Sequence, residues 1–239
     1  MAKGLFGYHR QGAVCLKIRS LLISLANEPS KYDQIVPKIE YWIEYVLREG
    51  FATVDELVGG VSDVAWEDVE GSFASVGRFL KEFYDTPHRS EQARSFVSQL
   101  CPYVLRWFAI TSTEDLRPKL VKGWGTSSST DSGFISAASF VGYLIEWGLL
   151  SHELVQRHLT KPLTNHYDND EAMDTPGATR AKAIYQLFIA AGNTLLQGLL
   201  APDDVQACFE ILKTWSHRKI GFDAVKLKVQ CATRGNASC

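Results

Sequence analysis

Apolar residues recur at helical spacing along almost the whole chain, and this pattern constrains the fold more than any other feature of the sequence. Between residues 14 and 25 they fall at i, i+4, i+7, i+8 and i+11, which is one face of a helix (Val14, Ile18, Leu21, Leu22, Leu25). The same period returns in residues 35–47, 66–83, 93–108, 134–145, 154–159, 183–199 and 205–215. Each apolar face needs a neighbour to cover it, so the pattern predicts an all-α fold.

Local signals predict where the helices of the first half begin and end, and Gly50 is expected to stop the helix of residues 35–47. Thr53-Val-Asp-Glu56 has the composition of a capping box, and we expect it to start a short helix that ends at Gly59-Gly60. Thr86-Pro87 has the pattern of an N-cap followed by a proline at the first helical position. Pro102 lies inside the next apolar stripe and predicts a kink or a break there.

The second half has similar signals. Ser151 is expected to cap a helix that ends near Pro162. Thr175-Pro176 and Pro202 are expected to open the next two helices, and the apolar period from 183 to 199 predicts that the first of them is continuous.

About ten helices joined mostly by short turns predict antiparallel neighbours. Stacked pairs of this kind form a HEAT- or armadillo-like superhelix, although no period of about 40 residues is visible and the repeats would be degenerate. We expect residues 1–220 to form one helical repeat domain and residues 221–239 a weakly ordered basic tail. The period-2 pattern at 225–231 would need a partner strand, so a short helix or poor order is preferred there.

Residues 122–133 form the least structured stretch, because glycine, serine and threonine dominate it. We expect a flexible connection of a length seldom found inside a compact core. The alternative is a domain boundary at this place. A long loop within one superhelix is preferred, since the helices on both sides still have one-sided apolar faces.

Charge and cysteine usage restrict the cellular setting. A net charge of −2 gives no global attraction to nucleic acid or to an anionic membrane. The five cysteines show no paired spacing, and three lie on apolar helical faces, which favours a reducing compartment. The first residues lack a signal-peptide run, because Arg10, Lys17 and Arg19 interrupt it, and no stretch reaches the length of a membrane span. We therefore expect a cytoplasmic protein, with the nucleus as the alternative.

No motif for an enzyme, a cofactor or a metal emerges. His152-Glu153 is followed by His158, six residues on, so the two imidazoles lie about 240° apart on a helix and do not form a zinc-protease pair. Cys101 lies in an apolar stripe without a basic neighbour, which indicates a structural thiol. The acidic run 168–174 lacks the glycine and the closing glutamate of a calcium loop. We expect a protein that is not an enzyme and binds no cofactor.

One corner of the sequence resembles a known family. Phe140-Val-Gly142, followed by Gly148-Leu149-Leu150-Ser151, is similar to the phenylalanine-x-glycine and glycine-leucine-leucine pattern of the middle domain of eukaryotic initiation factor 4-gamma and its relatives. In physical terms, Gly142 permits close approach of a second helix, Gly148 stops the helix, and the leucines staple the turn before the Ser151 cap.

Three further segments follow in the family's order, namely residues 17–33, 96–101 and 183–192. The family's asparagine after the first leucine pair is missing, and residues 53–90 exceed its pattern. The resemblance implies an armadillo/HEAT-type scaffold in translation or RNA metabolism, with a DEAD-box RNA helicase or a translation factor as its protein partner. A generic armadillo-type adaptor is the alternative.

Two groups of residues are the candidate binding sites. For a protein partner we expect the acidic loop and an indole in the 122–133 connection to provide the contacts (Trp124, Tyr167, Asp168, Asp170, Glu171, Asp174). The alternative function is RNA binding through the basic C-terminal end, with Trp215 and Phe222 available for stacking (Lys213, Arg218, Lys219, Lys226, Lys228).

Overall fold

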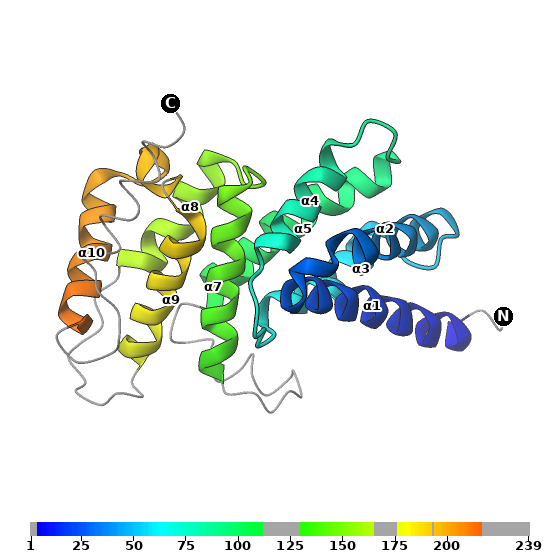
Figure 1. Ribbon diagram of the computed structural model, residues 1–239, viewed down its shortest axis with the longest axis horizontal. Helices are drawn as coiled ribbons and strands as arrows, with labels where there is room; N and C mark the ends of the chain where they lie inside the picture. The colour runs from blue at the N-terminus through cyan, green and yellow to red at the C-terminus, as the bar shows by residue number, and fades with distance from the viewer. Residues whose placement is uncertain (1–3, 112–129, 165–175, 193, 217–239) are drawn as a thin grey trace. The chain divides into compact units, whose positions relative to one another are not determined.

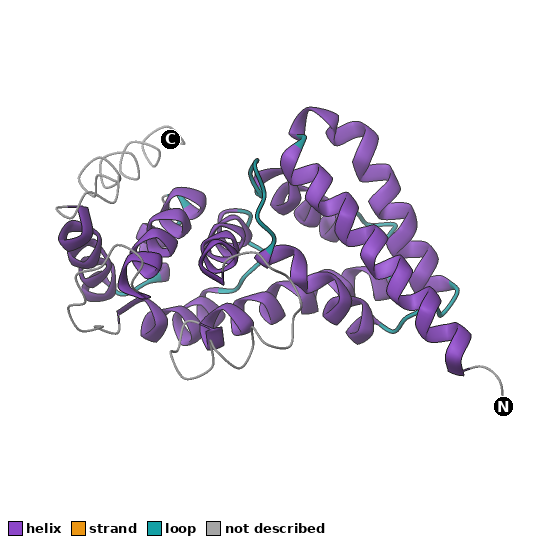
Figure 2. Cartoon of the chain, turned by 90° about the horizontal axis from the view of Figure 1, so that it is seen from below, coloured by secondary structure: helices purple, strands orange, loops and turns teal. Residues whose placement is uncertain are grey.

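The computed structural model describes residues 4–111, 130–164, 176–192 and 194–216. Within these ranges the chain forms nine α-helices and no strand, which confirms the all-α prediction (Figure 2). The chain divides into two compact units, Met1–Val104 and Leu105–Cys239. The predicted single domain of residues 1–220 stays a prediction, and the tail from residue 217 lies outside the described residues.

The first unit is built around the N-terminal helix. α1 (Gly4–Asn27) packs against α2 (Tyr32–Arg48), α3 (Val54–Val61) and α4 (Ala74–Asp85), and α5 begins at Glu91 and contributes its residues up to Val104 (Figure 1, blue to cyan). Two short 3-10 turns, η1 (Pro29–Lys31) and η2 (Ser62–Trp66), complete the unit. The helix-period positions of each segment form its core (Ile18, Leu22, Leu25, Ile39, Ile43, Phe79, Phe83, Phe96). Burial of one such side chain stabilises the fold by about 1.5–3 kcal/mol.

The capping box at Thr53 is confirmed. The Glu56 amide donates to Thr53 Oγ1 at 3.2 Å, and the Thr53 amide donates to Glu56 Oε2 at 2.8 Å. The predicted stop at Gly59-Gly60 is wrong, since α3 continues to Val61. A Cβ at Gly60 would lie 2.7 Å from Cys15 Sγ, so this glycine lets α3 lie close to α1. Its role is tertiary contact, which local sequence does not reveal.

Two other helix starts differ from the sequence expectation. The apolar stripe that begins at Trp66 is α-helical only from Ala74. The segment before Ala74 lies against the end of α1, because the Ser72 amide donates to the Ala26 carbonyl at 3.0 Å. Thr86 closes α4 instead of opening α5. Ser90 is the cap of α5, since the Ala93 amide donates to its Oγ at 3.1 Å.

Of the kink or break predicted at Pro102, the break does not occur, since α5 (Glu91–Thr111) continues through it, and the kink stays a prediction. Proline removes one backbone donor from the helix interior. A helix that continues through it is held by the packing of its neighbouring residues in the core. Leu100 and Val104 are both buried, which supplies this packing.

The second unit contains α7 (Thr130–Glu146), α8 (His152–Thr164), α9 (Pro176–Ala191) and α10 (Pro202–Ser216). α7 packs along α9, and α10 contacts both α8 and α9 (Figure 1). The predicted close approach at Gly142 is confirmed. A Cβ there would lie 2.6 Å from Ala190 Cβ and 2.7 Å from the Leu187 carbonyl oxygen of α9. The predicted starts at Pro176 and Pro202 are also correct.

The corner after α7 has the predicted form. Gly148 has a φ of +65°, its amide donates to the Ile145 carbonyl at 3.0 Å, and the Leu149 amide donates to the Leu144 carbonyl at 2.9 Å. This pair of hydrogen bonds is the Schellman motif, which satisfies carbonyls that the helix end leaves open. The Leu154 amide then donates to Ser151 Oγ at 3.4 Å, so Ser151 begins α8.

Three expectations for the second unit are wrong in part. Thr130–Gly133 belong to α7, so the flexible connection does not reach residue 133, and residues 122–129 lie outside the described ranges. α8 continues past Pro162 to Thr164. The helix predicted over 183–199 ends at Ala191, because Gly192 adopts a φ of +57°, and a separate π-turn, η4 (Leu195–Leu199), follows.

Candidate functional site

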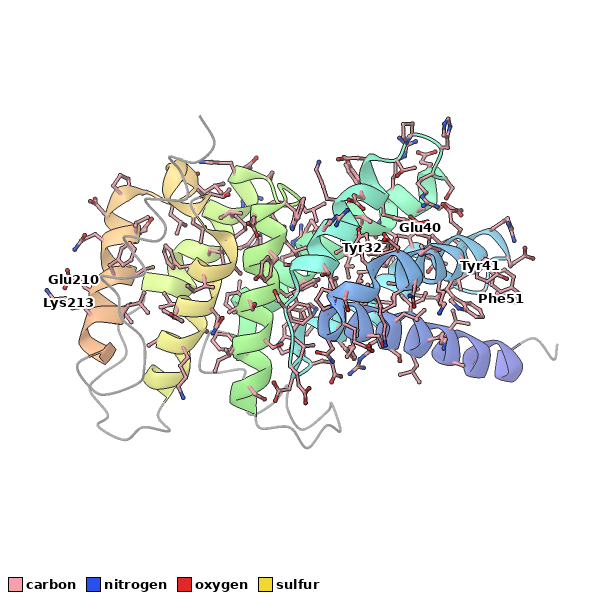
Figure 3. All side chains as sticks on the ribbon, in the orientation of Figure 1. Tyr32, Glu40, Tyr41, Phe51, Glu210 and Lys213 are labelled. Atoms are coloured by element: carbon pink, nitrogen blue, oxygen red, sulfur yellow. The ribbon has the colours of Figure 1, made fainter. Side chains whose placement is uncertain are left out.

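Four aromatic side chains form a continuous row on and just beyond α2. Tyr41 and Tyr45 stack with ring centroids 5.7 Å apart and an interplanar angle of 11°. Trp42 contacts both edge-on, at 5.5 Å from Tyr41 and 5.8 Å from Tyr45. Phe51 continues the row at 5.4 Å from Tyr45. We call Tyr41, Trp42, Tyr45 and Phe51 the aromatic row, and Figure 3 labels the two residues at its ends.

The helical period of α2 turns the row toward solvent. Ile39, Ile43 and Val46 form the buried face of this helix. Tyr41 and Tyr45 each stand two residues from Ile43, which at about 100° per residue places both on the opposite side of the helix. The row is therefore a second stripe on α2, separate from the one that enters the core.

The end of α2 brings Phe51 into the row. Gly50 has a φ of +64°, its amide donates to the Leu47 carbonyl at 3.3 Å, and the Phe51 amide donates to the Val46 carbonyl at 3.0 Å. This is again the Schellman motif, which confirms the predicted stop at Gly50. Because the chain reverses at Gly50, the Phe51 ring is directed back to Tyr45 instead of continuing away from the helix.

The row lies at the surface, with one exposed ring and three half-buried rings. Tyr41 has 57% of its surface exposed, and the other three rings are half-buried. Among the described residues, the other exposed large hydrophobic side chains are Leu16 and Tyr84, and neither belongs to the row. Scattered single apolar residues are normal on protein surfaces, whereas a contiguous group marks an interaction surface.

The acidic residues of α2 are engaged away from the row. Arg89 forms ion pairs with Glu40 and with Glu44, the second at 4.0 Å, and Ser90 Oγ donates to Glu44 at 3.0 Å. The guanidinium of Arg89 also lies 4.6 Å from the centre of the Phe83 ring. These contacts tie the segment between α4 and α5 to one side of α2 and give Glu40 and Glu44 a structural role.

A second tie joins the start of α2 to α4. The Tyr32 hydroxyl donates to Glu82 at 2.6 Å, and Arg78 donates from Nε to the same carboxylate at 2.8 Å while its guanidinium lies 4.4 Å from the Tyr32 ring centre. Burial, followed by the hydrogen bond to Glu82, raises the pKa of the Tyr32 phenol well above its usual value. Tyr32 therefore stays protonated as a donor, and it serves as a fixed structural contact.

The sequence-predicted protein-binding residues lie outside the described residues, and this includes Trp124, Tyr167, Asp168, Asp170, Glu171 and Asp174. The same is true of the predicted RNA-binding residues Arg218, Lys219, Lys226 and Lys228. Lys213 is described and lies exposed on α10, one turn from Glu210 (Figure 3). Both site predictions stay predictions.

The thiol and imidazole groups occupy the settings expected of structural side chains. Cys15, Cys101 and Cys208 are buried, and burial raises the pKa of the Cys101 thiol to about 12. Burial lowers the pKa of His158, and the positive charges of Arg106 and of Arg157, which precedes His158 in α8, lower it further. Within the described ranges no three His, Cys, Asp or Glu side chains are grouped as a metal site would require.

The helical period of residues 35–47 groups Trp42 with the apolar positions expected to be buried, so the aromatic row was not predicted from the sequence. The structure shows that indole half-exposed and in contact with Tyr41 and Tyr45. A signal was present: the helical period places Tyr41 and Tyr45 away from Ile39 and Ile43, with Trp42 between these tyrosines and the buried face. Aromatic residues on the polar side of an amphipathic helix are the pattern that indicates an exposed surface of this kind.

The chain matches no protein-family model, no curated protein and no solved structure. Of the helices in the described ranges, none has the length and apolar composition needed to cross a membrane. The function is consequently inferred from the residues of this chain, and the surface that supports the inference is the aromatic row.

Proposed function

We propose that the protein is a non-enzymatic, protein-binding helical scaffold whose contact surface is the aromatic row. The observation that carries the proposal is a contiguous set of rings at the surface of α2, in which Tyr41 is exposed and Trp42 and Tyr45 are half-buried. Tyrosine and tryptophan are enriched among the residues that dominate binding energy at protein interfaces. Their rigid, amphipathic rings provide contact area at a small cost in side-chain entropy.

The setting of the row also supports a scaffold. α2 is fixed by Arg89 on one side and by the Tyr32 contact at its start, so its outer face is held in one orientation. A rigid helix presents side chains more accurately than a loop does. Binding through such a face loses little conformational entropy, because the surface is already formed.

We further propose that the helices belong to HEAT/armadillo-like pairs and that the scaffold acts in translation or RNA metabolism inside the cell. The support is the resemblance of the α7–α8 corner to the middle domain of initiation factor 4-gamma, together with the close packing at Gly142 and the turn at Gly148. A DEAD-box helicase or a translation factor is the partner that this resemblance implies.

Quantitative affinity capture with the full-length chain tests the proposal. Wild type, Tyr41→Ala/Tyr45→Ala and Tyr84→Ala are compared, with Tyr84 as the matched control because it is an exposed tyrosine of α4 that lies outside the row. We expect at least one protein to be recovered with wild type and with Tyr84→Ala, and to fall about tenfold or more with the double variant.

The outcomes separate the parts of the proposal. Recovery of helicases or translation factors supports the proposed pathway, whereas recovery of unrelated proteins alone contradicts it and leaves the adaptor role. Recovery that is equal for all three chains contradicts the role of the aromatic row. Far-UV circular dichroism of each variant shows that a loss of binding does not come from unfolding.

A further inference from the structure

We infer that the aromatic row binds a short acidic segment of a partner protein, in which aliphatic or proline side chains are bounded by carboxylates. The inference rests on the proposed scaffold function and specifies the chemistry of its partner. Three features carry it: the apolar length of the row, the basic residues of α2 before Tyr41 and after Tyr45, and the engagement of Glu40 and Glu44 by Arg89 and Ser90.

The apolar part of the site is long and narrow. Lys38, Tyr41, Trp42 and Tyr45 stand at i, i+3, i+4 and i+7 and share one face of α2, and Arg48 follows one turn later. From Lys38 to Arg48 the helix rises about 15 Å. An extended peptide of about five residues has the same length, so a short segment covers the row from end to end.

Cations bound the row at both ends. Lys38 is exposed and forms no ion pair within the part of the chain that the structure describes. Arg48 is exposed at the other end and donates from Nε to Glu49 at 3.1 Å, which leaves its terminal amino groups for a second carboxylate. A partner segment with a carboxylate at each end of an apolar centre complements this arrangement.

The acids of α2 do not oppose such a partner. Glu40 stands about 100° around the helix from Tyr41 and about 140° from Tyr45, Glu44 stands about 60° and 100° from the same residues, and both acids are held by the Arg89–Ser90 segment. The Arg89 guanidinium offsets one of these two negative charges, and the contacts with Arg89 and Ser90 hold both carboxylates. The other charges of this stretch of α2 and its end are those of Lys38 and of Arg48 with its neighbour Glu49.

The ring geometry favours a peptide over single-stranded RNA. Tyr41 and Tyr45 stack on one another, and Trp42 presents its edge to both at interplanar angles of 75° and 84°. Tyr41 and Tyr45 therefore each turn one ring face to the other, and the perpendicular Trp42 ring does not continue their stack, while a nucleic-acid platform offers a series of open faces to successive bases. A phosphate backbone also needs cations along the row, whereas the basic residues of α2 itself, Lys38 and Arg48, stand before Tyr41 and after Tyr45.

Selection from a displayed library of random short peptides tests the inference. The full-length chain is the bait, and the affinity of the most enriched peptide is then measured by fluorescence anisotropy. We expect enriched peptides to carry Asp or Glu on both sides of aliphatic or proline residues. Tyr45→Ala should weaken binding about tenfold or more, and Lys38→Glu about three- to tenfold. Lys182→Glu, an exposed lysine of α9, should leave the affinity unchanged.

Failure of the inference differs from failure of the scaffold proposal. Enriched peptides that lack carboxylates, or an affinity that Lys38→Glu leaves unchanged, overturn the acidic segment while row-dependent capture of a whole protein still stands. No enrichment at all overturns it as well. If a labelled oligouridylate binds more tightly than the enriched peptides and its binding depends on Tyr45, the row is assigned to RNA instead. Circular dichroism of Tyr45→Ala and Lys38→Glu guards against misfolding, and Lys38→Glu changes only an exposed position.

Discussion

Replacement of Gly142 by alanine tests the packing on which the second unit depends. The added Cβ would lie 2.6 Å from Ala190 Cβ, 2.7 Å from the Leu187 carbonyl oxygen and 3.1 Å from the Ala191 amide nitrogen. Two of these three atoms are backbone, so α9 must move away. Overpacking of this kind costs about 1–3 kcal/mol, and the higher helix propensity of alanine offsets about 1 kcal/mol. Because the contacts are backbone, we expect a net loss of about 1–2 kcal/mol.

Gly59→Ala is the matched control for this change. Gly59 lies inside α3, and a Cβ built there meets no atom within 4 Å. Alanine should therefore stabilise the first unit, by up to about 1 kcal/mol. Urea unfolding of the full chain measures the change in the free energy of unfolding for both variants. Faster hydrogen exchange in peptides from α7 and α9 then assigns the loss of stability in Gly142→Ala to the interface of these helices. Unchanged or higher stability of Gly142→Ala, with unchanged exchange in α7 and α9, would refute the packing argument.

Three further predictions concern caps, thiols and pH. Thr53→Ala should cost about 1 kcal/mol in urea unfolding, since it removes the hydroxyl that accepts from the Glu56 amide, while Thr53→Ser should retain most of the stability. Cys101 should react with a disulfide reagent only as fast as the chain unfolds, because burial raises its pKa to about 12, and rapid labelling of the folded chain at this residue would contradict that. His158 has a folded-state pKa lowered by burial and by neighbouring arginine charges, so the neutral form favours folding and stability falls as the pH drops below about 6.5. Acidification from about pH 7 to about pH 5 should therefore destabilise wild type more than His158→Gln, and equal sensitivity of the two chains would disprove this assignment.

The structure was predicted correctly from the sequence where the deciding residues are close together in the chain, or where the apolar helix period allows only one buried face. The Thr53 capping box depends on residues three positions apart, and its hydrogen bonds form as expected. Gly148 and Gly50 ended their helices because a left-handed residue favours glycine. Gly142 was recognised as a close approach from its place in an apolar helix.

The errors arose where a contact between distant segments decides the outcome. Gly60 did not end α3, because its missing side chain makes room for Cys15 of α1. Trp66 did not begin a helix, because the segment after it is bonded to the end of α1 through the Ala26 carbonyl. In both cases the competing partner is more than 40 residues away in sequence and leaves no local signal.

The candidate site was missed for a related reason. Trp42 fits the edge of the apolar stripe of α2, and periodicity alone does not say which of two adjacent stripes enters the core. The structure separates them, since Ile43 is fully buried while Tyr41 is exposed. The residues proposed from the sequence, such as Trp124 and Asp168, lie in segments that are outside the described ranges.

Oxidative footprinting of the full-length chain, alone and bound to a captured partner protein, tests the central claim most directly. If the aromatic row is the contact surface, partner binding should protect Tyr41, Trp42 and Tyr45 from hydroxyl radicals and leave Tyr84 unchanged. Equal oxidation of the row in the free and bound chain, with protection elsewhere, would contradict the assignment of this surface.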